Sequence, residues 1–263
     1  MAADDWARTW IGGSTPDKIT VAGRDLPSEI MGRLTLTELT FLLVTRRDPT
    51  DSECRLLDAV LVSLADHGLT PSALAARLTY TGAPEAIQGA IAAGLLGAGS
   101  VFLGPTGDTA QFLSEALQSH GLTDTEVDVD ESTLRDIALE AVDSRRASRL
   151  RVPGLGHPVH KDVDPRTPRL YELAAAEGLL GPHLRLLQVV AKVHEERTGR
   201  HLPINGAGAG GAALVDIGVP PEAVRGVVLI ARTAGLVAHL VEEATRPLGM
   251  PLWLEIERRS GEA

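Results

Sequence analysis

The 263-residue sequence predicts an all-α protein. Apolar residues recur at helical spacing in segment after segment. Aromatic residues make up only 3% of the chain, and Val, Ile and Thr rarely alternate with polar residues, so a β-sandwich or β-barrel is not expected. Hydrophobic residues make up 44%, which is enough to form the core of one large domain or two small ones.

Helices are expected throughout the N-terminal half, after a segment at 19–25 that fits either a short hairpin or a loop. The expected helices span residues 35–46, 51–68, 71–78, 84–96 and 106–118. Asp51 and Ser52 are the expected N-cap of the second helix. The apolar face of that helix is formed by Leu56, Leu57, Val60, Leu61 and Leu64.

Five more helices are expected in the C-terminal half, and several begin with proline in the first turn, where its missing N–H costs nothing. They span residues 131–145, 166–177, 182–197, 209–217 and 220–245. Segments 86–96 and 227–241 are apolar nearly all round, which is typical of helices buried in a core or between subunits. We therefore expect a homodimer formed through these helices, although a large helical core explains the pattern nearly as well.

Composition excludes several classes of protein. The formal charge of −10 argues against a nucleic-acid-binding protein. No window approaches 18 uninterrupted apolar residues, and the first 25 residues carry charges together with Trp6 and Trp10, so neither a membrane span nor an export signal is expected. The single cysteine, Cys54, lies within an amphipathic helix with no evident base beside it and is expected to be structural. A cytoplasmic location is the expectation that follows.

Cationic side chains are concentrated in segment 145–166. They are Arg145, Arg146, Arg149, Arg151, His157, His160, Lys161 and Arg166. Gly154 and Gly156 lie among them and let the backbone approach a ligand closely. This combination predicts a site for a small anionic ligand, such as a phosphate or carboxylate, and the alternative is an exposed basic loop. The two histidines have no obvious third partner, so no metal site is expected.

Two further loops contain less specific signals. His67 follows a predicted helix and, taken alone, is expected to cap it and interact with its dipole. The glycine-rich segment 206–211 follows no predicted strand and has no acidic residue at the ribose-binding distance, so a dinucleotide site is not expected. The chain also lacks a Gly-x-Ser-x-Gly elbow, a Walker A motif and a His-Glu-x-x-His motif.

Four segments, in the same order, resemble the citrate synthase superfamily over about residues 10–253. The most specific is 153–166, Pro-Gly-Leu-Gly-His-Pro-Val-His-Lys-Asp-Val-Asp-Pro-Arg, which is similar to a family segment ending in Asp-Pro-Arg. The others are Asp66-His67-Gly68, segment 230–239 with Arg232 and His239, and the tail at 246–251. The likeness is greatest to stand-alone citryl-CoA lyase-like proteins and the citrate synthase-homology part of ATP-citrate lyase.

The resemblance implies a citrate synthase-like fold with a large and a smaller helical domain. The large part would span approximately 1–150 and 215–263, and the small part 151–214. It also assigns roles. His157 would hydrogen-bond the oxygen at the carbon that is attacked or released, and His67 would hold the oxaloacetate or citrate portion. The expected substrate-binding residues are Arg166, Arg232, Asn205 and Arg246. The expected coenzyme A-binding residues are Val152, Pro153, Gly154, Leu155, Gly156 and Lys161.

The sequence departs from the family pattern at three positions, one of which is Pro158, where many relatives have an arginine after the loop histidine. The segment Pro203-Ile-Asn-Gly-Ala-Gly, aligned through Asn205, has Ala207 where the family has a proton-transferring aspartate. A histidine of true citrate synthases that steadies the enolate is represented by Gly104. Asp108 and Asp216 lie near these segments in sequence and are possible substitutes.

The expected activity is cleavage or formation of the C–C bond between acetyl-CoA and oxaloacetate by a citryl-CoA lyase-like enzyme. The alternatives are a non-catalytic homologue that binds acyl-CoA or dicarboxylate, and an enzyme for a different acyl-CoA. No permanently bound cofactor is expected, because the coenzyme A thioester is the substrate. The chain contains no ATP-binding signature, so synthesis of citryl-CoA would require a separate ligase partner.

Overall fold

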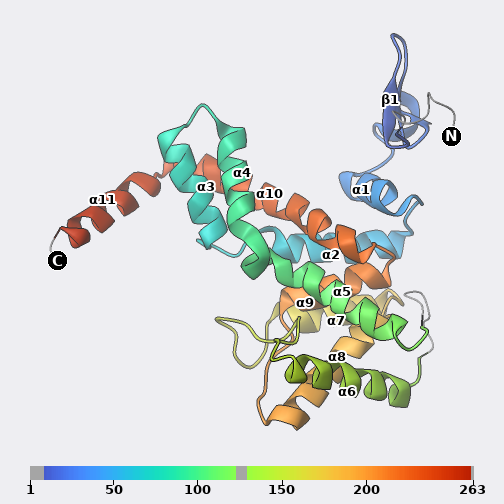
Figure 1. The fold of residues 1–263 in the computed structure, drawn as a ribbon. Coiled ribbons are helices and arrows are strands. Elements are labelled where there is room, and N and C mark those ends of the chain that lie inside the picture. The colour runs from blue at the N-terminus through green and yellow to red at the C-terminus, as the bar shows by residue number, and fades with distance from the viewer. Residues whose placement is uncertain (1–8, 123–128, 262–263) are drawn as a thin grey trace, which may run out of the picture.

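The computed structural model describes residues 9–122 and 129–261 and confirms the all-α prediction. Eleven α-helices and one small sheet make up this part of the chain, as Figure 1 shows. The sheet lies near the N-terminus at one end of the molecule, and the last helix lies near the other end (Figure 1). The helices between them form the body that carries the candidate site.

The N-terminal segment is a hairpin, which resolves the choice left open by the sequence. Strands β1 (Gly12–Ser14), β2 (Ile19–Val21) and β3 (Arg24–Asp25) pair antiparallel in that order. A π-helical turn, η1 (Leu26–Ile30), and helix α1 (Leu36–Thr45) follow.

The N-cap of helix α2 (Asp51–Ala65) lies one residue before the expected cap. Thr50 is the N-cap, and its side chain accepts from the amide of Glu53 while Glu53 bonds back to Thr50. The expectation that Asp51 and Ser52 form the cap was wrong, because this reciprocal capping box places both of them inside the helix. Most of the predicted apolar face is buried, and the helix leads directly to His67.

Long helix α10 (Pro221–Thr245) packs against helices from the first half of the chain. Its neighbours include α2, α3 (Pro71–Gly82), α4 (Ile87–Ala98) and α5 (Gly104–Gln118). A π-helical segment, η2 (Gly99–Leu103), joins α4 to α5. Gly235 makes the α10–α2 contact close, because a Cβ at that position would lie 2.1 Å from the carbonyl oxygen of Ala65.

Helix α9 (Gly206–Asp216) is the central helix of the other part of the core. It packs against α2, α5, α7 (Arg166–Ala176) and α8 (Pro182–Thr198). Helix α6 (Glu131–Ala147) covers α8. A Cβ at Gly208 would lie 2.5 Å from the Cα of Gly154. The glycines of α9 therefore allow its first turn to lie against the predicted anion-binding loop.

The structure adds one helix that the sequence pattern did not indicate, α11 (Gly249–Ser260). Gly249 is its only buried residue, so the helix has no apolar face packed on the rest of the described chain. Two helical stretches, Ile87–Gln118 and Pro221–Thr245, are long and apolar enough to span a bilayer by length and composition alone. Helices at the core of a globular protein meet the same criterion, and both stretches pack against other helices here.

Candidate active site

Three segments that are distant in sequence converge at one place. The end of α2 brings His67, the loop between α6 and α7 brings His157 and His160, and the start of α7 brings Arg166. Helix α10 brings Arg232, whose pKa responds to Asp66 and to the charge of Arg166. The structure thus brings together residues that the sequence analysis assigned to a single site.

Three imidazole rings form the centre of this site. The rings of His157 and His160 stack with their centroids 4.5 Å apart at an interplanar angle of 25°. His67 meets both rings edge-on, at 5.4 Å from His157 and 6.2 Å from His160. The third imidazole partner that the sequence did not reveal is therefore His67, and one ring nitrogen of each residue lies within 4.8 Å of the others.

The hydrogen bonds of His157 decide how this cluster can act. Its Nδ1 accepts the backbone N–H of Val159 at 3.2 Å and that of His160 at 3.0 Å. The ring proton of neutral His157 must therefore lie on Nε2. A histidine that ligates a metal through one nitrogen normally donates an N–H from the other, which is the reverse of this arrangement. The cluster fits hydrogen bonding to a substrate oxygen better than it fits metal ligation.

His157 is kept neutral by its surroundings. Burial lowers its pKa, the carboxylate of Asp164 opposes that shift, and the positive charges of His160, Arg166 and His67 add to it. The net effect is a pKa below the usual value of 6.5. Near neutral pH, His157 therefore presents an Nε2–H donor without carrying a charge.

Arg166 is oriented by Asp164, which the sequence analysis did not assign to the site. Asp164 is fully buried, and its Oδ2 also accepts the amide N–H of Gly206 at 2.8 Å. Burial raises the pKa of Asp164, but the hydrogen bonds from Arg166 and Gly206 outweigh it and hold the carboxyl well below its usual range. A Cβ at Gly206 would lie 2.5 Å from Nε of Arg166, so only glycine leaves room for the guanidinium there.

Arg232 is a buried cation with unused hydrogen-bonding capacity. Its side chain is 7% exposed, and neither Nε nor Nη1 has a hydrogen-bond partner among the described residues. Asp66 Oδ1 lies 3.7 Å from Nη1, which is an ion-pair distance but too long for a hydrogen bond. Burial lowers the pKa of Arg232. A buried guanidinium without partners is costly, and an anionic ligand would satisfy it.

Asp66 is held in place by a chain of contacts that continues through His239. Asp66 Oδ1 is 2.8 Å from Nε2 of His239, and Nε of Arg77 is 3.1 Å from Nδ1 of the same ring. Arg77 in turn donates to Glu243 at 2.9 Å and also bonds Glu242. Because Asp66 ends α2 in an extended conformation, it is the C-cap, and the expectation that His67 caps this helix was wrong.

The backbone predicted to bind coenzyme A lies beside the start of α9. Leu155 and Ile204 form an isolated antiparallel bridge, and the amide of Gly156 donates to Pro203 at 2.7 Å. Asn205 caps α9 with its Oδ1 and donates from Nδ2 to the carbonyl of Gly156 at 2.8 Å. Asn205 thus joins the loop to the helix, and a direct role in substrate binding stays a prediction.

Other residues of the expected coenzyme A site lie along the same loop. Val152 and Gly154 are buried, and Pro153 is half-buried. Lys161 is exposed, and its Nζ bonds the carbonyl of His157 at 3.1 Å. Arg151 is exposed at the start of the loop. The segment therefore offers exposed cations around a well-ordered turn.

Two residues considered from the sequence, Arg246 and Asp108, have no contact among the described residues that places them at the cluster. Arg246 follows the end of α10, 14 residues after Arg232, which corresponds to about 21 Å of helix. The chain therefore does not bring Arg246 to its own histidine cluster. Asp108 is exposed on α5 and has no hydrogen bond or ion pair with the described residues of the cluster. Ala207 is half-buried in the first turn of α9, directly after Gly206.

Asp216 has a structural role, so it does not replace the missing aspartate. Its Oδ1 lies 2.8 Å from Nδ1 of His183, and its two oxygens accept the amides of His183 and Leu184 at the start of α8. Nε2 of His183 is 3.1 Å from Oγ of Ser114. The arrangement Ser-His-Asp resembles that of a hydrolase triad, but the side chains of all three residues are buried, so a substrate does not reach them.

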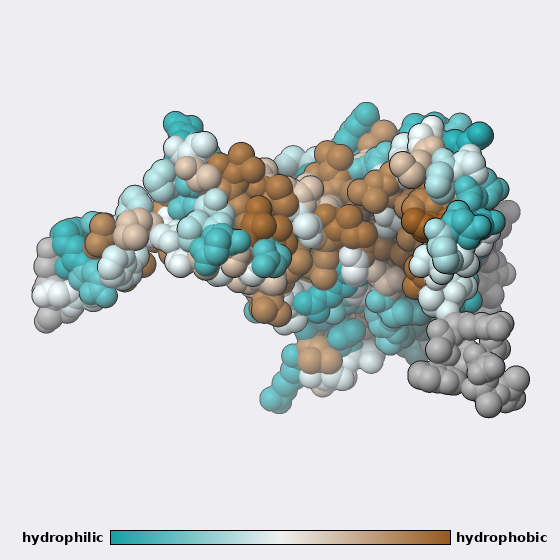
Figure 2. Space-filling view, turned by 90° about the horizontal axis from the view of Figure 1, so that it is seen from above, coloured by the Kyte–Doolittle hydropathy of each residue, from teal (hydrophilic) through white to brown (hydrophobic). Residues whose placement is uncertain are grey.

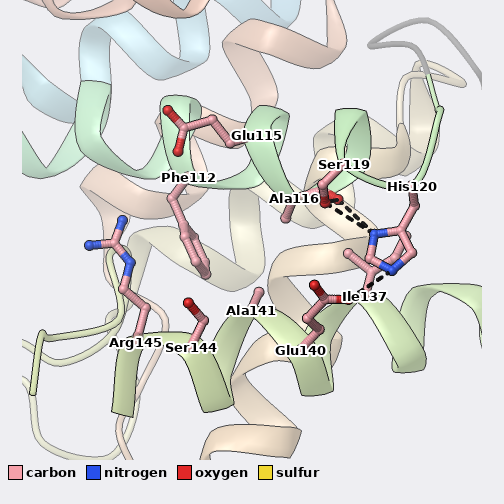
Figure 3. A pocket seen from close by; sticks show the side chains of 10 residues that line it. All are labelled: Phe112, Glu115, Ala116, Ser119, His120, Ile137, Glu140, Ala141, Ser144 and Arg145. Atoms are coloured by element: carbon pink, nitrogen blue, oxygen red, sulfur yellow. Dashed lines mark hydrogen bonds and ion pairs between the residues drawn. The ribbon is translucent and has the colours of Figure 1, made fainter. Parts of the chain in front are cut away.

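A hollow of about 200 Å³ between α5 and α6 is separate from the histidine cluster. Figure 3 shows Phe112 and Arg145 at one end of it and His120 near Glu140 at the other. The Arg145 guanidinium lies 5.1 Å from the centre of the Phe112 ring. Of the residues that line this hollow, only Arg145 belongs to the predicted cationic segment, and none has an expected catalytic, substrate-binding or coenzyme A-binding role.

The residues that orient the site were not predicted from the sequence. Asp66 and Asp164 each lie within two residues of a predicted site residue, inside the same motifs, so their positions were an available signal. His160 also lies in the predicted loop, but its stacking on His157 depends on a turn that spacing does not reveal. No sequence pattern indicated a role for Arg77, because the residue that it contacts, His239, lies 162 residues away in sequence.

Comparisons with known proteins agree with the helical fold described above. Residues 20–253 match the family described as "Citrate synthase, C-terminal domain". The citryl-CoA lyase structure from Hydrogenobacter thermophilus has a TM-score of 0.79 and 31% identity, over 91% of this chain and 87% of that one. A mutant ATP citrate lyase from Methanosaeta concilii, in complex with (3S)-citryl-CoA, has a TM-score of 0.72 and 21% identity, over 90% and 39% of the two chains.

Curated relatives are longer than this chain. A citrate synthase from Deinococcus radiodurans is 26% identical over 205 residues, which cover 76% of this chain and 50% of the relative. The chain spans about half the length of the curated relatives it matches. Because the family match extends over nearly all of the described fold, the chain belongs to the citrate synthase family.

Proposed function

We propose that the protein is a citryl-CoA lyase-type enzyme, which cleaves or forms the C–C bond between acetyl-CoA and oxaloacetate. The observation that carries the proposal is the buried guanidinium of Arg232, with two nitrogens unpartnered, close enough to Arg166 for its pKa to respond. Two guanidinium groups beside a cluster of imidazoles suit a substrate with several carboxylates and a reacting oxygen. The likeness to the Hydrogenobacter citryl-CoA lyase supports the same assignment.

The side chains support a retro-Claisen cleavage in the following way. Arg166 and Arg232 would hold the carboxylates of the substrate, with His67 beside them. Nε2–H of His157 would donate to the hydroxyl oxygen and stabilise the alkoxide that develops there. The C–C bond then breaks, the alkoxide carbon becomes the ketone of oxaloacetate, and the electron pair passes to the enolate of acetyl-CoA.

Coenzyme A would lie along the loop before His157. The exposed Arg151 and Lys161 would bind its phosphates, and the backbone of 152–156 would border the adenine. The coenzyme is the carrier of the substrate in this proposal. A separate ligase partner would supply citryl-CoA where citrate is the starting compound.

A homodimer is the second part of the proposal. Helix α10 leaves a helical stripe of small or apolar residues exposed, which are Gly226, Ile230, Ala234, Val237 and Val241. Ala92 and Leu96 are exposed in the same way on α4, and Trp253 and Leu254 on α11. Figure 2 shows apolar side chains gathered on the face seen from above. A second copy of the chain, covering its stripe with an identical one, fits this surface.

The activity is tested by mixing the purified protein with citryl-CoA. Malate dehydrogenase and NADH report the oxaloacetate, and chromatography reports the acetyl-CoA. We expect turnover that His157→Ala abolishes. Absence of turnover with citryl-CoA would refute the proposal. If coenzyme A thioesters still bind in that case, the result favours the alternative that Ala207 raises, a homologue that binds without reacting or that acts on another acyl-CoA.

A further inference from the structure

Cleavage of citryl-CoA requires a group that takes the hydroxyl proton, and His157 does not meet this requirement. Its Nδ1 lone pair accepts two backbone N–H groups, so its only proton is on Nε2. Nε2–H donates to an oxygen but has no lone pair in the ring plane for a second proton. Protonation at Nδ1 would break both backbone hydrogen bonds. His157 therefore stabilises the oxygen while another group moves the proton.

The carboxylates near the cluster are also engaged. Asp164 has both oxygens bound by Arg166 and Gly206. Asp66 bonds His239 and accepts the amide of Gly68 at 2.8 Å. Burial raises the pKa of each carboxyl, but the hydrogen bonds that each accepts lower that pKa by more, so the net shift is downward. A carboxylate stabilised in this way is a poor proton acceptor, and Ala207 supplies none at the vacant position.

His160 remains as a candidate for the group that moves the proton, and its position is fixed relative to His157. The two rings stack, and the amide of His160 is one of the two donors to Nδ1 of His157. His160 is half-buried, whereas His67 is exposed and belongs to a different segment. A rigid turn thus places a second imidazole beside the donor that contacts the reacting oxygen. This preorganisation is what a proton-transfer group needs.

We propose that His160 is the proton-transfer residue of C–C bond cleavage, an assignment that rests on the proposed lyase activity. A neutral ring nitrogen of His160 takes the hydroxyl proton as the C–C bond breaks and the ketone forms. The electron pair of that bond remains on the methylene carbon as the thioester enolate. His160 then gives its proton to that carbon, which becomes the methyl group of acetyl-CoA. The proton moves from oxygen to carbon, and the imidazole returns to its neutral state.

The test is a comparison of His160→Gln with the wild type in citryl-CoA cleavage. Removal of a positioned acid–base group lowers kcat by about 10²–10⁴-fold, and KM is expected to stay within about 3-fold. His160→Asn is a second variant in case the first folds poorly, and a melting curve shows whether each is folded. His120→Gln is the matched control, because His120 lies in the separate hollow between α5 and α6. We expect it to retain the wild-type rate.

Two readouts separate proton transfer from a structural role. Wild-type protein with acetyl-CoA and oxaloacetate in D₂O is expected to exchange the methyl protons of acetyl-CoA, and His160→Gln is expected to lose that exchange. The double variant with His160→Gln and Ala207→Asp is expected to have a kcat at least about 10-fold higher than that of His160→Gln alone, because a carboxylate at position 207 would take over part of the proton transfer. A purely structural defect would not be restored by a carboxylate.

The outcomes distinguish this assignment from the proposed activity. If the wild type cleaves citryl-CoA and His160→Gln does so at a similar kcat, the assignment to His160 is overturned and the lyase activity stands. A rise in KM with unchanged kcat overturns it equally, since His160 would then act in binding. If the wild type itself does not cleave citryl-CoA, the proposed activity fails and the assignment fails with it.

Discussion

Arg166 donates two hydrogen bonds to Asp164, from Nε to Oδ1 at 3.0 Å and from Nη2 to Oδ2 at 2.7 Å. The backbone amide of Arg166 donates to the same carboxylate at 3.1 Å, and so does that of Gly206. One buried carboxylate therefore fixes the first residue of α7 and the first residue of α9 relative to each other. The Asp-Pro-Arg motif gains a physical meaning from this contact, because its aspartate positions its arginine.

Asp164→Asn tests this positioning role. An amide leaves the Arg166 guanidinium without a charged partner and turns an N–H group toward its donors. Breaking one side of a buried ion pair costs about 3 kcal/mol of unfolding free energy. Urea denaturation measures it. Asp162→Asn is the control, because Asp162 is exposed in the same loop, and we expect no change. Equal stability of the two variants would contradict a positioning role for Asp164.

Arg232→Met separates binding from stability. The guanidinium has two buried unpartnered nitrogens, so replacing it with an apolar side chain removes a desolvation cost in the unliganded protein. We expect an unchanged or raised melting temperature. Binding of oxaloacetate is expected to weaken by about 10–100-fold, because hydrogen bonds to charged groups contribute about 1.5–3 kcal/mol.

Isothermal calorimetry with oxaloacetate and a melting curve on the same sample measure both effects. Arg225→Met is the matched control, since Arg225 is exposed on the same helix. A variant that loses stability and keeps its affinity would show that Arg232 is structural.

Local signals predicted the helices, because their periodicity and first-turn prolines depend on neighbouring residues only. Pro71 and Pro182 begin their helices as expected. The N-cap of α2 was misplaced by one residue because three residues in a row are good caps, and only the reciprocal bond of Thr50 with Glu53 decides between them. Helix α11 was missed because its apolar side chains do not pack on the rest of the described chain, so no buried face marks it.

The resemblance named the residues that meet at the site, whereas the contacts that hold those residues in place were not predicted. His67, His157, Arg166 and Arg232 meet as expected. The contact of Arg77 with His239 joins α3 to α10, and no local pattern reveals such a tertiary contact. Arg246 differs from these residues, since it follows the end of the long α10, and its role in substrate binding stays a prediction.

The lowered pKa of His157 predicts how stability changes with pH. In the unfolded chain this histidine binds a proton near pH 6.5, and in the folded protein burial lowers that pKa. Between the two values the unfolded state binds more protons, so the contribution of His157 to the unfolding free energy falls as pH falls through this window. Above the unfolded pKa both states are neutral and no penalty arises.

Urea denaturation of the wild type and of His157→Gln at about pH 7.5 and about pH 5.5 measures this contribution. We expect the stability of the wild type, relative to the variant, to decrease at the lower pH. A relative stability that rises at the lower pH would mean that the protonated ring is favoured in the folded protein. That result would contradict both the burial argument and the neutral donor assigned to His157.

Leu96→Glu tests the proposed homodimer. Leu96 is 82% exposed on α4 and lies two residues after Gly94, a position where α4 packs closely against Leu236 of α10. A second copy that covers this surface would bury Leu96, and a glutamate would then bring an unpaired charge into the interface of each protomer. Burying a polar group without a partner costs about 1–3 kcal/mol, so the dimer dissociation constant is expected to rise by at least about 10-fold.

Light scattering coupled to size-exclusion chromatography measures the mass of each variant. Leu150→Glu is the matched control, because Leu150 is 56% exposed and lies in a different segment, the loop after α6. We expect a dimer for the wild type and for Leu150→Glu, and a shift toward monomer for Leu96→Glu. A monomeric wild type would refute the homodimer, and the exposed apolar stripe of α10 would then have to be covered by a different partner.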